Sequence, residues 1–151
     1  MNRQPIIGII GGGTCSPKIA GVARAVGEEV AVRKGMVVCG GLGGVMEAAC
    51  QGAHAKGGTT IGLLPGCSKA SANAFVDIVI PTGMGDARNI MIIRTADAVI
   101  AIDGEYGTLS EIAFCLKFKV PVVGLATWDV DPRIQEASTP KTAVEMAFDL
   151  L

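Results

Sequence analysis

Short runs of aliphatic residues alternate along the chain with longer stretches in which apolar positions recur every three to four residues. The runs cover residues 5–10, 36–39, 59–64, 75–80, 98–102 and 121–125. Unbroken apolar runs of this length are typical of strands that are buried on both faces of a parallel sheet. The pattern therefore predicts six buried strands.

The stretches between these runs carry the start and stop signals of helices. Ser16 can cap a helix whose first turn holds Pro17, and Gly35 ends that segment. Thr139 and Pro140 repeat the same start signal near the end of the chain. Further helices are predicted over residues 43–56, 86–95 and 107–119.

The alternation of strand and helix predicts the fold. We expect a single α/β domain over residues 1–151, with a Rossmann-like doubly wound parallel sheet and helices on both faces. Half of the residues are hydrophobic and only 4% are aromatic, so aliphatic side chains and glycine must form the core. Right-handed crossovers place all strand-to-helix turns at the carboxyl edge of such a sheet, where ligands bind.

Three of these turns are rich in glycine, and we expect them to meet at that edge. Glycine lets a ligand approach the backbone closely, and a helix that begins there presents unpaired N–H groups to an anion such as phosphate. The predicted ligand-binding residues are Gly11, Gly12, Gly13 and Thr14 in the first turn, Gly40, Gly41, Gly43, Gly44 and Met46 in the second, and Gly104, Tyr106, Gly107, Thr108 and Glu111 in the third.

Simpler structural explanations exist for some of these residues. The first turn can be a tight connection only, and Glu111 can merely complement the dipole of its helix. Arg88 begins a helix, where a cation is unfavourable for the dipole. It is therefore either a ligand-binding residue, with Asn89 as a second donor, or a solvated surface charge.

Composition argues against several classes of function. The net charge of −1 and the lack of a basic run argue against nucleic-acid binding. Five cysteines without CxxC spacing indicate a reducing compartment, so we expect a cytoplasmic protein. His54 is the only histidine, so no metal site and no Ser-His-Asp triad are predicted. The first residues do not show the pattern of a signal peptide and no apolar stretch reaches membrane-spanning length, so we expect no membrane partner.

Two common nucleotide-binding motifs are missing from the sequence. The first turn, Gly8-Ile9-Ile10-Gly11-Gly12-Gly13, does not match GxGxxG, and no acidic residue ends the second strand. The chain also lacks GxxxxGK[ST]. A dinucleotide site of the usual kind and a Walker-type NTPase are therefore not expected.

Read in chain order, the motifs resemble a known family. The Gly-Gly-x-Gly-Gly-x-Met turn at 40–46 is followed by Arg88 and then by Gly104-x-Tyr106-Gly107-Thr108-x-x-Glu111. Over residues 5–125 this string resembles the LOG-like superfamily, often mislabelled as lysine decarboxylases. It is most similar to the short branch that contains the molybdenum cofactor carrier proteins.

The resemblance implies a Rossmann-like domain that assembles into homo-oligomers, either dimers or tetramers. LOG enzymes split a nucleoside 5′-monophosphate at the N-glycosidic bond and release the free base and ribose 5-phosphate. If this chain is such a hydrolase, Arg88 and Glu111 are its catalytic residues. The carrier proteins share the scaffold and bind the phosphate-bearing pterin cofactor without a known turnover.

Two departures from the enzymes favour the carrier branch. LOG enzymes have Pro-Gly-Gly where this chain has Asp103-Gly104-Glu105, and the Glu105 carboxylate can repel phosphate unless it turns outward. Ser110 replaces one of the two acidic residues of the enzyme motif.

The sequence thus leads to three hypotheses. The first is a binding or carrier protein for a phosphorylated nucleotide-like or pterin cofactor, with molybdenum cofactor as the named ligand and no cofactor required. The alternative is a nucleoside 5′-monophosphate phosphoribohydrolase. The third is a structural or regulatory oligomer with a vestigial pocket.

Overall fold

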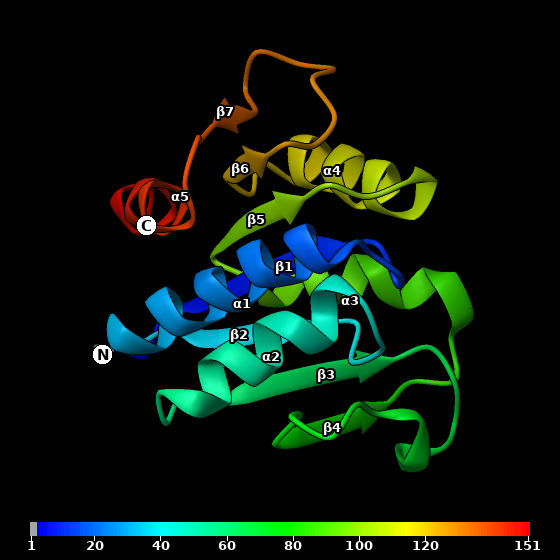
Figure 1. The fold of residues 1–151 in the computed structure, drawn as a ribbon. Helices are drawn as coiled ribbons and strands as arrows, with labels where there is room; N and C mark the ends of the chain where they lie inside the picture. Colours follow the sequence, from blue (N-terminus) through cyan, green and yellow to red (C-terminus); the bar gives the residue numbers. More distant parts are fainter. Residues whose placement is uncertain (1–2) are drawn as a thin grey trace.

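A seven-stranded, all-parallel sheet forms the centre of the protein in a computed structural model that describes residues 3–151 (Figure 1). The order across the sheet is β4-β3-β2-β1-β5-β6-β7. Ile7 of β1 lies opposite Val37 on one side and Ala98 on the other. The strands are β1 (Ile6–Gly11), β2 (Met36–Cys39), β3 (Thr60–Leu64), β4 (Ile78–Pro81), β5 (Ala98–Ile102), β6 (Val122–Leu125) and β7 (Gln135–Glu136).

Helices cover both faces of the sheet (Figure 1). One face packs against α1 (Pro17–Val32), α2 (Val45–Ala55) and α5 (Pro140–Asp149), and the other against α3 (Arg88–Thr95) and α4 (Tyr106–Phe118). Each face has its own cluster of buried apolar residues, formed mainly by Ile, Val and Ala. The predicted doubly wound Rossmann-like fold is therefore confirmed.

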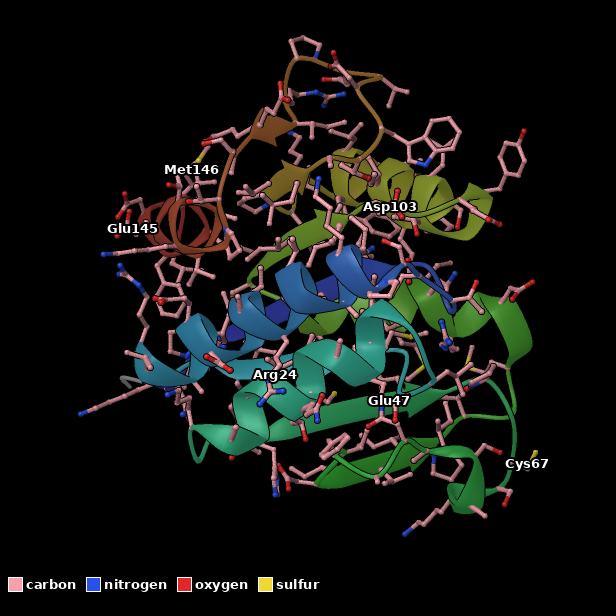
Figure 2. All side chains as sticks on the ribbon, viewed as in Figure 1. Arg24, Glu47, Cys67, Asp103, Glu145 and Met146 are labelled. Atoms are coloured by element: carbon pink, nitrogen blue, oxygen red, sulfur yellow. The ribbon has the colours of Figure 1, made fainter. Side chains whose placement is uncertain are left out.

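The α1 and α2 helices touch backbone to backbone. A Cβ on Gly27 would lie 2.0 Å from the Ala49 carbonyl oxygen, and one on Gly52 would lie 2.0 Å from that of Arg24. Figure 2 shows Arg24 where the two helices meet. Only glycine permits this approach, which brings the two helix axes close together.

Two sequence predictions about strands are wrong. Phe75 accepts a hydrogen bond from the Thr60 hydroxyl (2.6 Å) and donates its N–H to Asn73 Oδ1 (3.0 Å), so its backbone is held in a turn. The fourth strand therefore begins at Ile78 and not at residue 75. The β7 strand was not predicted, because its two residues are polar and exposed and only their pairing with β6 makes them a strand.

Helix boundaries differ from the predictions by one or two residues, and at α3 a different turn accounts for the two. A short 3-10 turn, η2 (Gly85–Ala87), precedes α3, which begins at Arg88. The predicted loop over 66–74 contains a second such turn, η1 (Lys69–Ser71). Within residues 3–151, no helix is long and apolar enough to cross a lipid bilayer.

The strand order reverses next to β1. The chain passes from β1 through β2 and β3 to β4, then returns to the other side of β1 to form β5. In open α/β sheets, the carboxyl ends of the strands at such a reversal leave a crevice in which ligands bind. The crevice here lies at the ends of β1, β2 and β5, where the three glycine turns begin.

Candidate ligand-binding site

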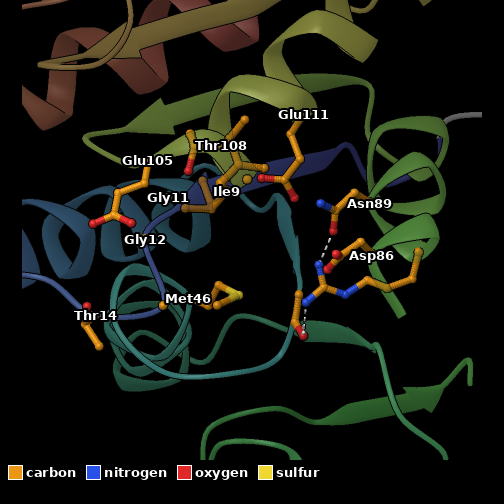
Figure 3. Close-up of a pocket in the computed structure, with 15 residues that line it drawn as sticks. Ile9, Gly11, Gly12, Thr14, Met46, Asp86, Asn89, Glu105, Thr108 and Glu111 are labelled. Atoms are coloured by element: carbon orange, nitrogen blue, oxygen red, sulfur yellow. Dashed lines mark hydrogen bonds between the residues drawn. The ribbon is translucent and has the colours of Figure 1, made fainter. Parts of the chain in front are cut away.

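A cavity of about 250 Å³ occupies this crevice (Figure 3). Its walls come from the ends of β1 and β2, from the start of α2, from η2 and α3, and from the start of α4. The lining residues are Ile9, Ile10, Gly11, Gly12, Gly13, Thr14, Gly40, Met46, Asp86, Arg88, Asn89, Glu105, Gly107, Thr108 and Glu111.

The structure brings most of the predicted site residues together, although they come from distant parts of the sequence. Those that line the cavity are Gly11, Gly12, Gly13, Thr14, Gly40, Met46, Arg88, Asn89, Gly107, Thr108 and Glu111. Those that do not line it are Gly41, Gly43, Gly44, Gly104 and Tyr106.

Backbone packing accounts for two of the glycines outside the cavity. Gly44 has φ +62°, and a Cβ on it would lie 2.3 Å from the Gly12 carbonyl oxygen. Gly104 has φ +98°, and a Cβ there would lie 2.2 Å from the Thr108 hydroxyl oxygen. Both positions therefore require glycine for the conformation of the turn, whatever binds beside it.

Tyr106 is 79% exposed and pairs with Trp128, with 5.9 Å between the ring centroids. It stands in the sequence between two lining residues, Glu105 and Gly107, but does not itself line the cavity.

The two helix starts at the cavity differ in what their N–H groups bind. The Val45 N–H at the start of α2 donates to the Gly12 carbonyl oxygen (3.0 Å), so the second turn packs against the first. At the start of α4, Glu105 supplies no side-chain cap, and the N–H groups of Tyr106, Gly107 and Thr108 have no partner within residues 3–151. Within the described residues, the α4 start thus has three N–H groups without a partner, and the α2 start has two, those of Met46 and Glu47.

Arg88 is buried, with 8% of its surface exposed, so it is not a solvated surface charge. Its Nη1 donates to Asn89 Oδ1, and its Nη2 donates to the Gly40 carbonyl oxygen at 3.4 Å. Its Nε is buried and has no hydrogen-bond partner in the described part of the chain. Burial lowers the pKa of Arg88, but a guanidinium stays charged in proteins. The cavity thus contains a positively charged guanidinium, one of whose N–H groups has no acceptor among the described residues.

Gly40 makes room for this guanidinium. A Cβ on Gly40 would lie 2.6 Å from Nη2 of Arg88 and 2.7 Å from the sulfur of Met46. The second glycine turn therefore serves the site by letting Arg88 lie across the end of β2.

Glu111 projects into the cavity from the second turn of α4 (Figure 3). The side chain is buried, and its carboxyl group makes no hydrogen bond or ion pair with any residue from 3 to 151. Burial raises the pKa of Glu111 to about 7, against a smaller lowering effect of Arg88. Near neutral pH this carboxyl is therefore divided between its protonated and charged forms. A carboxylate that only complemented the helix dipole would be expected in the first turn and in contact with solvent, whereas Glu111 is buried in the second turn.

Asp86 and Glu105 also line the cavity, and neither was among the predicted site residues. Both are exposed, and Figure 3 shows them on opposite sides. Asp86 follows Gly85 and lies two residues before Arg88. The glycines that precede it were the only sign in the sequence that this segment could reach the site. Asp86 and Glu111 are the two carboxyl groups close enough to affect the Arg88 guanidinium, whereas Glu105 lies across the cavity from it. Among the residues described, no cluster of three or more metal-ligating side chains occurs.

A model of the SLOG cluster4 family matches residues 4–149, which is nearly the whole chain. This chain belongs to the SLOG cluster4 family. An uncharacterized protein of Archaeoglobus fulgidus is 44% identical over 138 residues, which make up 91% of each chain.

Solved structures similar to this SLOG chain include two proteins that bind molybdenum cofactor. The molybdenum cofactor binding protein of Rippkaea orientalis is 35% identical, with a TM-score of 0.94 over 99% of each chain. The Moco carrier protein of Chlamydomonas reinhardtii is 32% identical, with a TM-score of 0.90 over 98% of each chain. The DNA processing protein A of Helicobacter pylori is 20% identical, with a TM-score of 0.73, and shows the fold alone. The family resemblance read from the sequence is thus confirmed.

Proposed function

We propose that this SLOG protein binds and carries a phosphorylated pterin cofactor, with molybdenum cofactor as the specific ligand. The similarity over almost the entire chain to proteins that bind this cofactor supports the proposal. The buried guanidinium of Arg88, whose Nε lacks a partner in residues 3–151, is the observation that carries it. Such a group is costly unless a ligand supplies an acceptor.

In this proposal the phosphate lies at the start of α4. The N–H groups of Tyr106, Gly107 and Thr108 and the Thr108 hydroxyl would donate hydrogen bonds to its oxygens. Arg88 would contribute the charge. At about 250 Å³ the cavity is smaller than the roughly 300–1,000 Å³ of typical small-molecule sites. The rest of the ligand would therefore extend out of the cavity past Thr14, Asp86 and Glu105.

We further propose a homo-oligomer, a dimer or a tetramer. The edge strand β4 exposes Ile78 (46%) and Ile80 (39%). Both share the sheet face of α3 and α4, because they lie opposite Ile61 and Leu63 of the cluster beneath those helices. A second copy that covers these side chains would remove apolar surface from water.

A phosphoribohydrolase remains the second candidate, and Glu111 is the observation that favours it. A carboxyl with a pKa of about 7 is poised for proton transfer near neutral pH, and Arg88 is available in the same cavity to bind a phosphate or ribose. In that case Glu111 would stabilise the developing oxocarbenium charge or transfer a proton.

One pair of assays distinguishes the two functions. Purified protein is incubated with molybdenum cofactor and dialysed, and the retained pterin is measured after oxidation to its fluorescent form. A parallel sample is incubated with AMP, and released adenine is measured by chromatography. We expect retained cofactor at micromolar protein and no adenine. Catalytic adenine release that disappears in Glu111→Ala would instead establish the hydrolase.

A further inference from the structure

Two segments beside the cavity mouth, the start of α4 and the loop after β6, carry apolar side chains that reach solvent. Tyr106 at the start of α4 is 79% exposed, and its partner Trp128 is in partial contact with solvent. Val130, two residues after Trp128 in the same loop, is 55% exposed. Tyr106 and Trp128 are 22 positions apart in sequence, yet their rings are in contact. We call these three residues the aromatic rim.

Hydrogen bonds hold the rim in place. Trp128 Nε1 donates to the Glu105 carbonyl oxygen (3.2 Å), and the Thr127 hydroxyl donates to the Asp103 carbonyl oxygen (2.6 Å). The segment after β6 is thereby fixed to the turn between β5 and α4. Because these bonds hold the Trp128 ring against Tyr106 at the surface, the pair favours a contact with another molecule.

The surface around the rim is acidic. Asp103, Glu105 and Asp129 are exposed carboxylates, and Figure 2 shows Asp103 on this part of the molecule. The nearby Arg133 is already engaged by Asp131 (2.8 Å). A second copy of the chain bound through this face would bring the carboxylates against their own equivalents, which is unfavourable. A partner with a basic surface and an apolar recess matches both the charge and the aromatic rings.

The rim also adjoins the cavity, because Glu105 and Gly107 line it on either side of Tyr106. A protein that covers the rim therefore comes to the cavity mouth. Three apolar residues, of which two are exposed, are few for a permanent interface but suit a transient contact. We propose that the aromatic rim is the docking site for the protein that accepts the ligand, a basic apoprotein that takes the cofactor directly from the cavity. This inference rests on the proposed carrier function.

The test measures transfer and retention separately. Cofactor-loaded protein is mixed with a molybdenum enzyme stripped of its cofactor, and the initial rate of enzyme reactivation is recorded at low and high salt. The variant Asp129→Lys/Val130→Ser changes the rim outside the cavity. The control Val32→Ser changes a 61% exposed side chain at the end of α1. Native mass spectrometry reports retained cofactor and subunit number for each protein.

We expect the rim variant to retain cofactor as the unmodified protein does but to reactivate the enzyme at least tenfold more slowly. High salt should slow the unmodified protein, and Val32→Ser should behave normally. Equal transfer rates for all three proteins would overturn the docking site and leave the carrier function standing. A changed subunit number in the rim variant would assign the rim to contacts between copies and also overturn it. If the unmodified protein retains no cofactor, the carrier function fails and the docking site fails with it.

Discussion

Replacing Glu111 with Gln should make the protein more stable at alkaline pH while leaving its stability at acid pH nearly unchanged. Burial of an unpartnered carboxyl raises the pKa of Glu111 from its ordinary value of 4.5 to about 7. The folded state therefore binds this proton more tightly than the unfolded state does. The resulting stability is fully present below about pH 4.5 and is lost as the pH rises to about 7.

The size of the effect follows from the pKa difference. Each unit of pKa corresponds to about 1.4 kcal/mol, so ionisation of Glu111 costs the folded state about 3 kcal/mol above pH 7. Glu111 as a residue is only 6% exposed, so solvent screening reduces this value little. A neutral Gln avoids the cost at every pH.

Urea unfolding at pH 5 and pH 8 measures this difference. The gap in free energy of unfolding between Glu111→Gln and the unmodified protein should grow by about 2–3 kcal/mol from pH 5 to pH 8. Glu47→Gln, an exposed change on α2, is the matched control and should show no such growth (Figure 2). A gap for Glu111→Gln that is the same at both pH values would refute the reasoning.

Four further predictions concern binding, packing and assembly. Arg88→Ala should weaken binding of the phosphorylated ligand about 10- to 100-fold in calorimetric titration, because hydrogen bonds to charged groups contribute about 1.5–3 kcal/mol; unchanged affinity would remove Arg88 from the site. Gly40→Ala puts a methyl group 2.6 Å from the guanidinium and should weaken the same ligand, whereas Gly21→Ala meets nothing within 4 Å and should leave affinity unchanged. Gly27→Ala should lower the free energy of unfolding by about 2 kcal/mol, because its methyl group lies 2.0 Å from a backbone carbonyl oxygen of α2; a urea midpoint like that of Gly21→Ala would contradict the tight helix contact. Ile80→Lys should reduce the number of subunits seen by light scattering, and an unchanged mass would show that β4 lies outside the interface.

The parts of the fold that depend on local patterning were predictable from sequence. The strand 98–102 is apolar throughout and bounded by polar residues, and its observed limits match the prediction. Ser16 and Pro17 start α1 as expected, with the Ser16 hydroxyl accepting from the Ile19 N–H (3.2 Å). Convergence of the glycine turns followed from topology alone, since parallel strands place their carboxyl ends at one edge.

Features that depend on long-range contacts were not predictable. Phe75 is apolar, as residues of buried strands usually are. The hydrogen bond from the Thr60 hydroxyl to its carbonyl oxygen nevertheless holds its backbone in a turn. Gly44 and Gly104 look like ligand-binding glycines, yet their positive φ and nearest atoms show a role in the turns themselves. The burial of Arg88 depends on the room that Gly40 leaves for it. The spacing of residues along the sequence gives no sign of this contact.

The cavity gathers buried polar groups that lack hydrogen-bond partners in the described part of the chain. Arg88 is buried with an Nε that no residue in 3–151 satisfies, and Glu111 is buried without a hydrogen bond in the same range. Both lie in one cavity with the uncapped start of α4. Such departures from a stable arrangement are expected where a ligand supplies the missing partners.

The central claim is that this cavity holds a phosphorylated pterin cofactor through Arg88 and the start of α4. Native mass spectrometry of the protein loaded with molybdenum cofactor tests it most directly, with Arg88→Ala measured beside it. The account predicts one retained cofactor per subunit in the unmodified protein and loss of that mass in Arg88→Ala. A cofactor-free spectrum of the unmodified protein, or equal retention by both proteins, would contradict it.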